Sequence, residues 1–267
     1  MELSLEEKKQ RLFAQLRSLG REGLLIAFSG GVDSVTLAAA AQSIGVSRLE
    51  LATCHSLLHS AADLAAARKG AAELGLPLHE LALELTQLPQ VMQNSRERCY
   101  HCKKQIFSRL WQLAQERNLA ALAEGANADD LLVIRPGLRA GDELAVARPL
   151  AQAGLTKAEL RAMAREWGLS CHDKPSTPCL ASRFPYDTAL SEELLRRVEA
   201  GEMLLEGCGL RGFRLRCHGE LARIECDPAQ APLLLAQSAT ICPALKKLGF
   251  RYITYDMEGF HSGSFDS

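Results

Sequence analysis

A short apolar run at residues 24–28 passes directly into the hexapeptide Ser-Gly-Gly-Val-Asp-Ser at 29–34 and then into an alanine-rich stretch that ends near Gly45. An apolar run of this length is typical of a strand that is covered on both faces. Paired glycines let the backbone turn sharply and approach an anion, and the following helix offers unpaired N–H groups at its N-terminus. The sequence therefore predicts a strand, a phosphate-binding loop and a helix in succession.

The alternation of strand and helix continues along the chain, which predicts an α/β fold: a Rossmann-like parallel sheet with right-handed crossovers and helices on both faces. A capping box formed by Thr156 and Glu159 marks the start of a later helix. The further expected elements are strands at 49–55, 79–83 and 119–124, and helices at 61–75, 100–118 and 156–167.

The pattern changes after about Pro185. A helix at 191–206 is followed by two alternating runs around Gly219, which predict an antiparallel hairpin, and then by a helical stretch and a last strand at 251–256. This order indicates a smaller α+β domain. We therefore predict two domains, residues 1–185 and 186–267.

The charges are nearly balanced, with 31 Lys and Arg against 32 Asp and Glu in 267 residues and a formal net charge of −1. A surface that generally coats nucleic acid is therefore not expected. The longest apolar runs are far shorter than the roughly 20 residues that span a bilayer, and the acidic N-terminus has no continuous apolar segment of a signal peptide. We expect a cytoplasmic protein without membrane or nucleic-acid partners.

Each polar residue of the hexapeptide has an expected role. Gly30 and Gly31 form the turn, the hydroxyls of Ser29 and Ser34 are further donors to phosphate, and Asp33 is placed to hold Mg²⁺. The Gly-x-x-x-x-Gly-Lys-Ser/Thr spacing of a Walker A loop is absent, as is the Gly-x-Gly-x-x-Gly of a dinucleotide site.

Three of the nine cysteines have sequence neighbours that suggest a metal-binding or catalytic role. In a reducing compartment, metal or catalytic roles are favoured over disulfides. Cys99 and Cys102 form a C-x-x-C pair at the start of a predicted helix, where the helix N-terminus and flanking basic residues favour thiolate ligation. Zinc, a redox pair and an iron–sulfur cluster all fit such a pair. Cys179 lies in a proline-broken loop, which core packing explains poorly.

The hexapeptide resembles the signature of the PP-loop ATP pyrophosphatases, and the chain as a whole resembles the LarE family of pyridinium-3,5-biscarboxylic acid mononucleotide sulfurtransferases. The resemblance covers about residues 5–256. It rests on six blocks that occur in order at 29–34, 98–103, 124–130, 135–140, 178–183 and 213–225.

The resemblance implies an enzyme that uses ATP and Mg²⁺ to adenylate a carboxylate of that mononucleotide, with release of pyrophosphate, and then replaces oxygen with sulfur for nickel-pincer cofactor biosynthesis. Residues 52–55 would lie near the adenine. In the family, sulfur comes either from a sacrificial cysteine at the position of Cys179 or from a [4Fe–4S] cluster, which Cys99, Cys102 and Cys179 would hold here. Relatives suggest a homo-oligomer.

Several alternatives remain at this point. A structural zinc site would need four protein ligands and no open position. His101 or Cys171 would then be the fourth ligand beside Cys99, Cys102 and Cys179. The chain is also compatible with a tRNA thiolation enzyme, although the balanced charge and 5% aromatic residues give little support for RNA binding. The remaining alternative is a nucleotide-binding redox sensor without catalytic activity.

Four more residues complete the candidate site. Arg214 and Arg216 alternate on a predicted strand and share one face, where arginine forks suit the phosphate of the substrate; the alternative is an ordinary solvated strand face. Arg183 is a candidate for the substrate's carboxylate or phosphate. Glu124, at a strand end, is a candidate to bind metal or orient the adenylate, unless it is simply solvated. The candidate catalytic residues are thus Cys179, Glu124 and Arg183.

Overall fold

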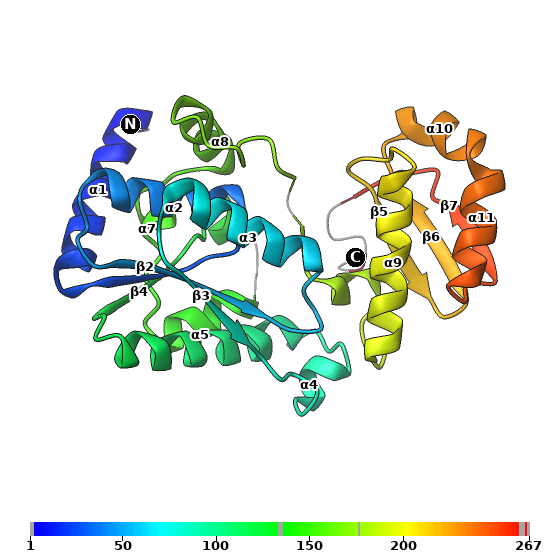
Figure 1. Cartoon of the computed structure of the whole chain (residues 1–267), viewed down its shortest axis with the longest axis horizontal. Coiled ribbons are helices and arrows are strands. Elements are labelled where there is room, and N and C mark those ends of the chain that lie inside the picture. Colours follow the sequence, from blue (N-terminus) through cyan, green and yellow to red (C-terminus); the bar gives the residue numbers. More distant parts are fainter. Residues whose placement is uncertain (1–2, 133–135, 176, 262–264, 266–267) are drawn as a thin grey trace. The chain divides into compact units, whose positions relative to one another are not determined.

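The computed structural model describes residues 3–132, 136–175, 177–261 and 265, so the first residue of the block at 135–140 lies outside the described residues. The chain forms two compact units (Figure 1). Unit 1 comprises residues 1–85 and 99–176, and unit 2 comprises residues 86–98 and 177–267. The predicted boundary between residues 185 and 186 differs from this division.

Unit 1 contains the parallel sheet that the sequence predicted, and its strands lie in the order β3-β2-β1-β4. The chain runs outward from β1 through β2 to β3 and then places β4 on the other side of β1. The strand order therefore reverses at β1, and the loops after the carboxyl ends of β1 and β4 lead away in opposite directions. Ligands of open α/β sheets bind in the crevice between such loops. The strands are β1 (Leu24–Ala27), β2 (Leu49–His55), β3 (Leu78–Ala82) and β4 (Ala121–Glu124).

Helices cover both faces of this sheet (Figure 1). Leu24 and Ile26 of β1 pack into a core with α1, α2, α3 and α8, whereas Leu25 packs on the opposite face against α5. This two-sided burial is the reason why the first strand is a continuous apolar run. The helices of this unit are α1 (Leu5–Leu19), η1 (Gly20–Glu22), α2 (Val32–Ser43), α3 (Ala61–Leu74), α5 (Arg98–Glu116), η2 (Ala128–Leu132), α6 (Pro136–Glu143), α7 (Pro149–Gln152) and α8 (Lys157–Glu166).

The predicted capping box at Thr156 is confirmed. The Thr156 hydroxyl accepts a hydrogen bond from the backbone N–H of Glu159, and the Glu159 carboxylate accepts one from the backbone N–H of Thr156. Because these bonds satisfy N–H groups that an α-helix leaves open, they fix the first residue of α8 at Lys157.

Unit 2 contains a three-stranded sheet in the order β5-β6-β7. β5 and β6 form the predicted antiparallel hairpin, and β7 pairs parallel to β6. Leu215, Cys217 and Ile224 are buried, and their alternation along the strands places them on one face of this sheet. The elements are α4 (Pro89–Met92), η3 (Leu180–Arg183), α9 (Glu192–Gly207), β5 (Arg214–His218), β6 (Leu221–Glu225), η4 (Pro228–Gln230), α10 (Ala231–Ala236), α11 (Ser238–Lys247) and β7 (Tyr252–Tyr255).

Segment 86–98 belongs to unit 2 because of contacts distant in sequence. The buried Asn94 side chain donates to the carbonyls of Phe184 at 3.2 Å and Pro185 at 2.7 Å. The N–H of Leu190 donates to the carbonyl of Met92 at 2.7 Å. No local pattern encodes such long-range pairs, so the sequence did not indicate this division.

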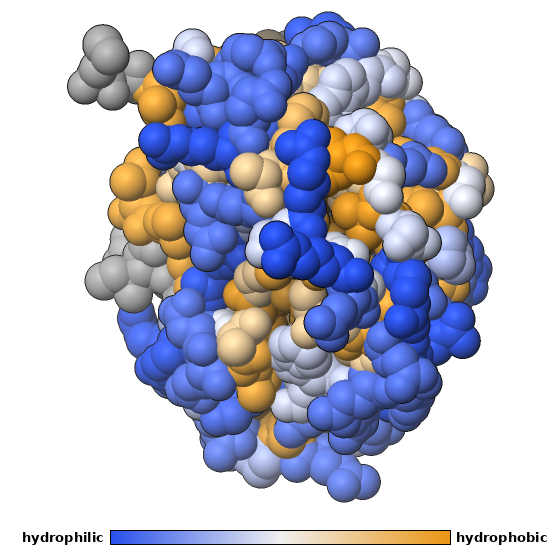
Figure 2. All heavy atoms as spheres, turned by 90° about the vertical axis from the view of Figure 1, so that its left-hand side faces the viewer, coloured by the Kyte–Doolittle hydropathy of each residue, from blue (hydrophilic) through white to orange (hydrophobic). Residues whose placement is uncertain are grey.

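None of the helices in the described part of the chain is both long enough and apolar enough to cross a membrane. The face in Figure 2 is mainly hydrophilic, and hydrophobic residues appear on it in separate groups.

Candidate functional site

The phosphate loop of unit 1 lies between β1 and α2 and is held by its own serines. The Ser34 hydroxyl donates to the carbonyl of Gly31 at 3.2 Å and accepts from the backbone N–H of Ser29, also at 3.2 Å. Gly31 is the N-cap of α2 and has no side chain to satisfy the helix N–H groups. The open N-terminus of a twelve-residue helix is therefore directed at the loop, which is favourable for an anion.

Gly30 is required at its position for two reasons. Its φ of +67° lies in the left-handed region, which residues with a Cβ rarely adopt. A Cβ at this position would also lie 2.4 Å from the backbone of Ala66 and of Ala67 in α3. The loop therefore passes too close to α3 for any residue other than glycine.

Asp33 faces a lysine that the sequence analysis did not select. Its carboxylate accepts from Lys157 Nζ at 2.5 Å and from Asn127 Nδ2 at 3.5 Å. Burial raises the pKa of Asp33, and the contact with Lys157 counters only part of this effect. Asp33 is thus a half-buried carboxylate at the start of α2. Mg²⁺ sites usually combine one or two carboxylates with the phosphates of a bound ligand. The carboxylate of Asp33 therefore fits a Mg²⁺ ion that is bound to a phosphate.

A second lysine lies beside the loop. Lys174 Nζ is 3.4 Å from the carbonyl oxygen of Gly30. Burial lowers the pKa of Lys174, and the interaction with Asp63 compensates only partly. A half-buried ammonium group at this position is suited to the negative charge of a triphosphate.

Glu124 lies at the end of β4, where it pairs in register with Ala27 of β1, the strand that leads into the phosphate loop. Its two carboxylate oxygens accept from Lys103 Nζ at 2.9 Å and from Arg148 Nε at 3.0 Å. Burial alone would raise the pKa of Glu124, but Lys103 and Arg148 outweigh it and hold this pKa below its usual value. In unit 1, Glu124 is thus an ionised carboxylate with two cationic partners.

The contact between Lys103 and Glu124 ties the C-x-x-C pair to the same edge of the sheet. Cys99 is exposed and Cys102 is partly buried, and they are the second and fifth residues of α5. Residues three apart share one face of a helix, so both thiols are presented on one side of α5 near its N-terminus.

In unit 2, Cys179 directly precedes η3, and its backbone carbonyl is held by the residues that follow. It accepts from the N–H of Ser182 at 3.0 Å and from the Ser182 hydroxyl at 2.8 Å. Arg183 is only 1% exposed and forms a bidentate pair with Glu202 of α9, with both N–O distances 2.9 Å. It also donates to the carbonyl of Pro178 at 2.8 Å. Arg183 therefore anchors the Cys179 loop to α9.

Three arginines gather on the polar face of the unit 2 sheet. Arg214 and Arg216 alternate on β5, and Arg216 is paired in register with Arg223 of β6. Directly paired residues of neighbouring strands point to the same face. We call this surface, formed by Arg214, Arg216 and Arg223, the arginine face. Arg216 also donates to the carbonyl of Ser182 at 2.6 Å, so the Cys179 loop lies against it.

The arginine face carries more positive than negative charge. Among the described residues, Arg216 and Arg223 share the carboxylate of Glu225, at 2.8 and 2.7 Å, and Arg223 also contacts the carboxylate of Asp256 at 3.5 Å, so two carboxylates face three arginines. Burial, followed by the positive charge of Arg183, lowers the pKa of Arg214 to about 10. A bound anion would relieve this repulsion, which is consistent with the predicted phosphate site.

Within the described residues, no group of three or more His, Cys, Asp or Glu side chains is in position to hold a metal ion. Cys171, an alternative zinc ligand, is buried in the core of unit 1, where burial raises its pKa. The three-cysteine site therefore stays a prediction.

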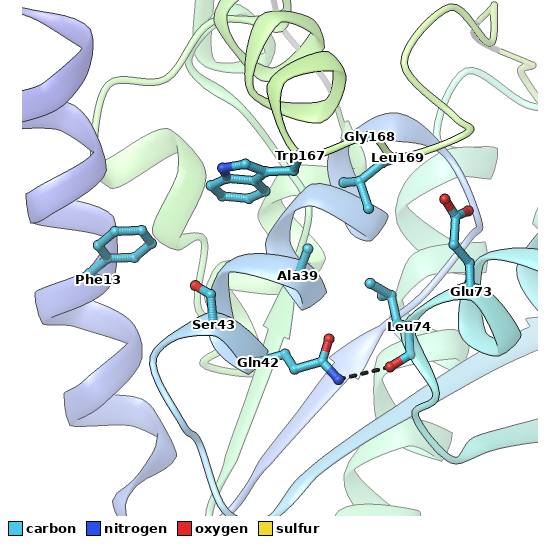
Figure 3. A pocket seen from close by; sticks show the side chains of 9 residues that line it. All are labelled: Phe13, Ala39, Gln42, Ser43, Glu73, Leu74, Trp167, Gly168 and Leu169. Atoms are coloured by element: carbon cyan, nitrogen blue, oxygen red, sulfur yellow. Dashed lines mark hydrogen bonds between the residues drawn. The ribbon is translucent and has the colours of Figure 1, made fainter.

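A hollow of about 610 Å³ in unit 1 contains none of the predicted site residues. Figure 3 shows that Gln42 donates to the carbonyl of Leu74, while Phe13 and Trp167 line the opposite side. The lining residues come from α1, from the C-terminal halves of α2 and α3 and from the segment directly after α8, whereas the phosphate loop is at the N-terminal end of α2.

Sequence reasoning missed Lys157, Lys174, Glu202 and Arg223. Lys157 follows a capping threonine and Lys174 precedes a proline, but neither context indicates a ligand. Only the fold brings Lys157 and Lys174 to the loop after β1.

Comparisons with known proteins show what this chain is similar to. The protein-family model described as asparagine synthase matches residues 14–109. The pyridinium-3,5-bisthiocarboxylic acid mononucleotide synthase of Lactiplantibacillus plantarum is 33% identical over 261 residues, which cover 97% of this chain and 94% of that protein. Uncharacterized proteins of Synechocystis sp. and Methanocaldococcus jannaschii are 35% and 28% identical, over 97% and 90% of this chain and 97% and 91% of their own lengths.

Proposed function

Because the chain belongs to the family of pyridinium-3,5-bisthiocarboxylic acid mononucleotide synthases, we propose that it uses ATP to convert a carboxylate of a pyridinium dicarboxylate mononucleotide into a thiocarboxylate, for nickel-pincer cofactor biosynthesis. The observation that carries the proposal is in unit 2: the Cys179 loop lies against a face with three arginines. That arrangement combines a sulfur atom with groups that bind phosphate and carboxylate.

Unit 1 would activate the carboxylate. The loop amides, Lys157 and Lys174 would bind the triphosphate, and Asp33 would hold Mg²⁺ on it. A carboxylate oxygen of the substrate then attacks the α-phosphorus, and pyrophosphate leaves with the electrons of the broken P–O bond. The resulting acyl adenylate has AMP as leaving group, which is far better than oxide, so adenylation divides one difficult substitution into two easier ones.

Unit 2 would bind the mononucleotide and deliver sulfur. Arg214 and Arg216 would bind its anionic groups through charge-assisted hydrogen bonds. A sulfur nucleophile then attacks the acyl carbon, and AMP leaves with the electrons of the C–O bond. Arg183 would act as a positioning residue, because its bonds to Glu202 and to Pro178 hold the Cys179 loop in place.

The cysteines present fit the donor set of an iron–sulfur cluster. Cys99 and Cys102 lie on one face of a helix N-terminus, and Cys179 would be the third thiolate, one short of the usual four. A [4Fe–4S] cluster bound in this way would supply an exchangeable sulfide.

Protein purified and reconstituted without oxygen is expected to contain about four iron and four labile sulfide per chain, because three thiolates hold one such cluster. Iron and sulfide are measured chemically together with the visible absorption. Cys102→Ser should lose the iron, whereas Cys242→Ser, which changes another partly buried cysteine, should keep it. Zinc in place of iron after reconstitution would contradict the cluster.

Lys174→Met is expected to raise the KM for ATP by about 10- to 100-fold, since a hydrogen bond to a charged group contributes about 1.5–3 kcal/mol. The lowered pKa of Lys174 means that its ammonium loses the proton earlier than an ordinary lysine as the pH rises. The KM for ATP of the unmodified enzyme should therefore rise at alkaline pH, and Lys174→Met should remove this dependence. Lys69→Met, at an exposed position of α3, is the control; an unchanged KM in Lys174→Met would refute the role.

The proposed function is tested by incubating the protein with ATP, a sulfide source and pyridinium-3,5-biscarboxylic acid mononucleotide. We expect AMP, pyrophosphate and thiocarboxylate to form together, all dependent on the mononucleotide. Turnover with tRNA instead would show a tRNA thiolation enzyme. ATP binding without pyrophosphate release would show a nucleotide sensor.

A further inference from the structure

Lys174 reaches the phosphate loop from a segment that has no regular secondary structure. Residues 167–175 follow α8 and contain turns but neither helix nor strand. The N–H of His172 donates to the carbonyl of Leu169 at 3.3 Å, and the N–H of Lys174 donates to the carbonyl of Cys171 at 3.0 Å. Segments with few backbone hydrogen bonds open easily, so the position of Lys174 depends on side chains that hold its backbone.

Arg161 of α8 holds the backbone of Lys174 directly. Its Nη1 donates to the carbonyl of His172 at 2.6 Å, and its Nη2 donates to the carbonyl of Lys174 at 2.8 Å. The guanidinium group is planar and rigid, so its two nitrogens keep the two carbonyls in a fixed arrangement. This partly buried side chain thereby ties Lys174 to a helix that packs in the core of unit 1.

Two further contacts fix the start of the segment. The backbone N–H and the hydroxyl of Ser170 donate to the carboxylate of Glu73 in α3, at 2.8 and 2.7 Å. The side chain of Cys171 is buried in the core of unit 1. These contacts anchor the chain four and three residues before Lys174, whereas Arg161 binds the carbonyl of Lys174 itself. Arg161 therefore determines the point from which the lysine side chain extends.

The ammonium group of Lys174 depends on this point. It lies 3.4 Å from the carbonyl oxygen of Gly30 and is carried by a flexible four-carbon stem. A lysine loses rotamer freedom when its end group is held in one place, and a mobile backbone beneath it would add to this cost. A group that is in place before the ligand arrives avoids that cost on binding.

We propose that Arg161 is a positioning residue of the phosphate site: by holding the carbonyls of His172 and Lys174, it keeps the ammonium group of Lys174 beside the phosphate loop, where it meets the triphosphate of ATP. Arg161 acts through Lys174 and not by touching the nucleotide. This inference rests on the proposed function, in which Lys174 binds ATP, and it adds the residue that places this lysine.

A double-mutant cycle on ATP binding tests the inference without mononucleotide or sulfur. Titration calorimetry of the full chain with ATP and Mg²⁺ measures the Kd. Arg161→Ala should raise the Kd about five- to 20-fold, within the range of coupling between residues in contact. In the Lys174→Met background, the same substitution should change the Kd by less than about twofold, because the lysine through which Arg161 acts is absent. A general loss of structure would raise the Kd by the same factor in both backgrounds.

Arg165→Ala is the matched control. Arg165 lies one helical turn after Arg161 and contacts the same segment through the side chain of Asp173, at 3.0 Å, where the two side chains are 65% and 72% exposed. Exposed ion pairs contribute little, so this variant should leave the Kd unchanged. Arg161→Lys keeps the positive charge without the fork and should raise the Kd about two- to fivefold. It is the second variant where Arg161→Ala does not fold.

An unchanged Kd in Arg161→Ala would overturn the inference, as would an equal increase in the Lys174→Met background or in Arg165→Ala. Normal ATP binding by Arg161→Lys would also overturn it, because charge and not the fork would then be responsible. These results would leave the proposed function intact. A Lys174→Met variant that binds ATP normally would instead remove both Lys174 and Arg161 from the phosphate site, and an unmodified protein that binds no ATP would overturn the proposed function.

Discussion

Cys179→Ala is expected to abolish formation of the thiocarboxylate while AMP and pyrophosphate still form. The reason is the separation of tasks: the phosphate loop belongs to unit 1, whereas Cys179 lies in unit 2 on the loop that Arg183 anchors. Loss of the sulfur-bearing group should lower product formation on the order of a thousandfold or more. Mass spectrometry of the product and quantitation of AMP measure the two half-reactions separately.

The controls for this variant are other cysteines of the same unit. Cys208→Ala and Cys242→Ala change partly buried thiols that lie outside the proposed site, and both should keep full activity. An undiminished yield of thiocarboxylate from Cys179→Ala would remove Cys179 from the mechanism. The intact mass after turnover then identifies the sulfur source, because a sacrificial cysteine that becomes dehydroalanine loses about 34 Da.

Gly30→Ala is expected to remove ATP binding and to destabilise unit 1. The left-handed conformation costs a residue with a Cβ about 1–2 kcal/mol, and the Cβ would also lie 2.4 Å from backbone atoms of α3, which cannot move as a flexible side chain would. We expect a decrease in the free energy of unfolding of about 3 kcal/mol or more. We also expect an affinity for ATP at least about 100-fold lower, because the loop amides lose their arrangement. Chemical denaturation and nucleotide titration measure these effects.

Gly45→Ala separates the two causes. Gly45 also has a positive φ, +75°, but a Cβ there would meet no atom within 4 Å. This variant should lose only about 1–2 kcal/mol from the backbone conformation and should bind ATP normally. If Gly30→Ala binds ATP as well as Gly45→Ala does, the hexapeptide is not the phosphate loop.

Much of the fold follows from local patterns. The apolar run that became β1 sends Leu24 and Ile26 to one core and Leu25 to the other, so its lack of alternation correctly indicated a strand covered on both faces. Thr156 and Glu159 marked the start of α8 because a capping box is satisfied by residues three apart. The hairpin of β5 and β6 was visible because its two strands are joined by a turn at Gly219.

The partners of the candidate residues were not visible in this way. Glu124 stays a candidate to bind metal or orient the adenylate, and the sequence did not indicate that its oxygens accept from Lys103 and Arg148. Arg183 stays a candidate for the substrate's carboxylate or phosphate, and the sequence did not indicate its bidentate pair with Glu202. Each of these pairs joins residues that are 19 or more positions apart, and charge alone does not reveal which carboxylate an arginine will meet.

The sequence by itself determined the order of strands and helices, the phosphate loop and the residue types able to carry the chemistry, because these depend on side-chain periodicity and on short-range backbone hydrogen bonds. Only the tertiary structure decided that segment 86–98 joins unit 2 and that Lys157 and Lys174 reach the loop. These features depend on contacts between residues far apart along the chain, which form when the sheets and helices pack and which leave no periodic signal in the sequence.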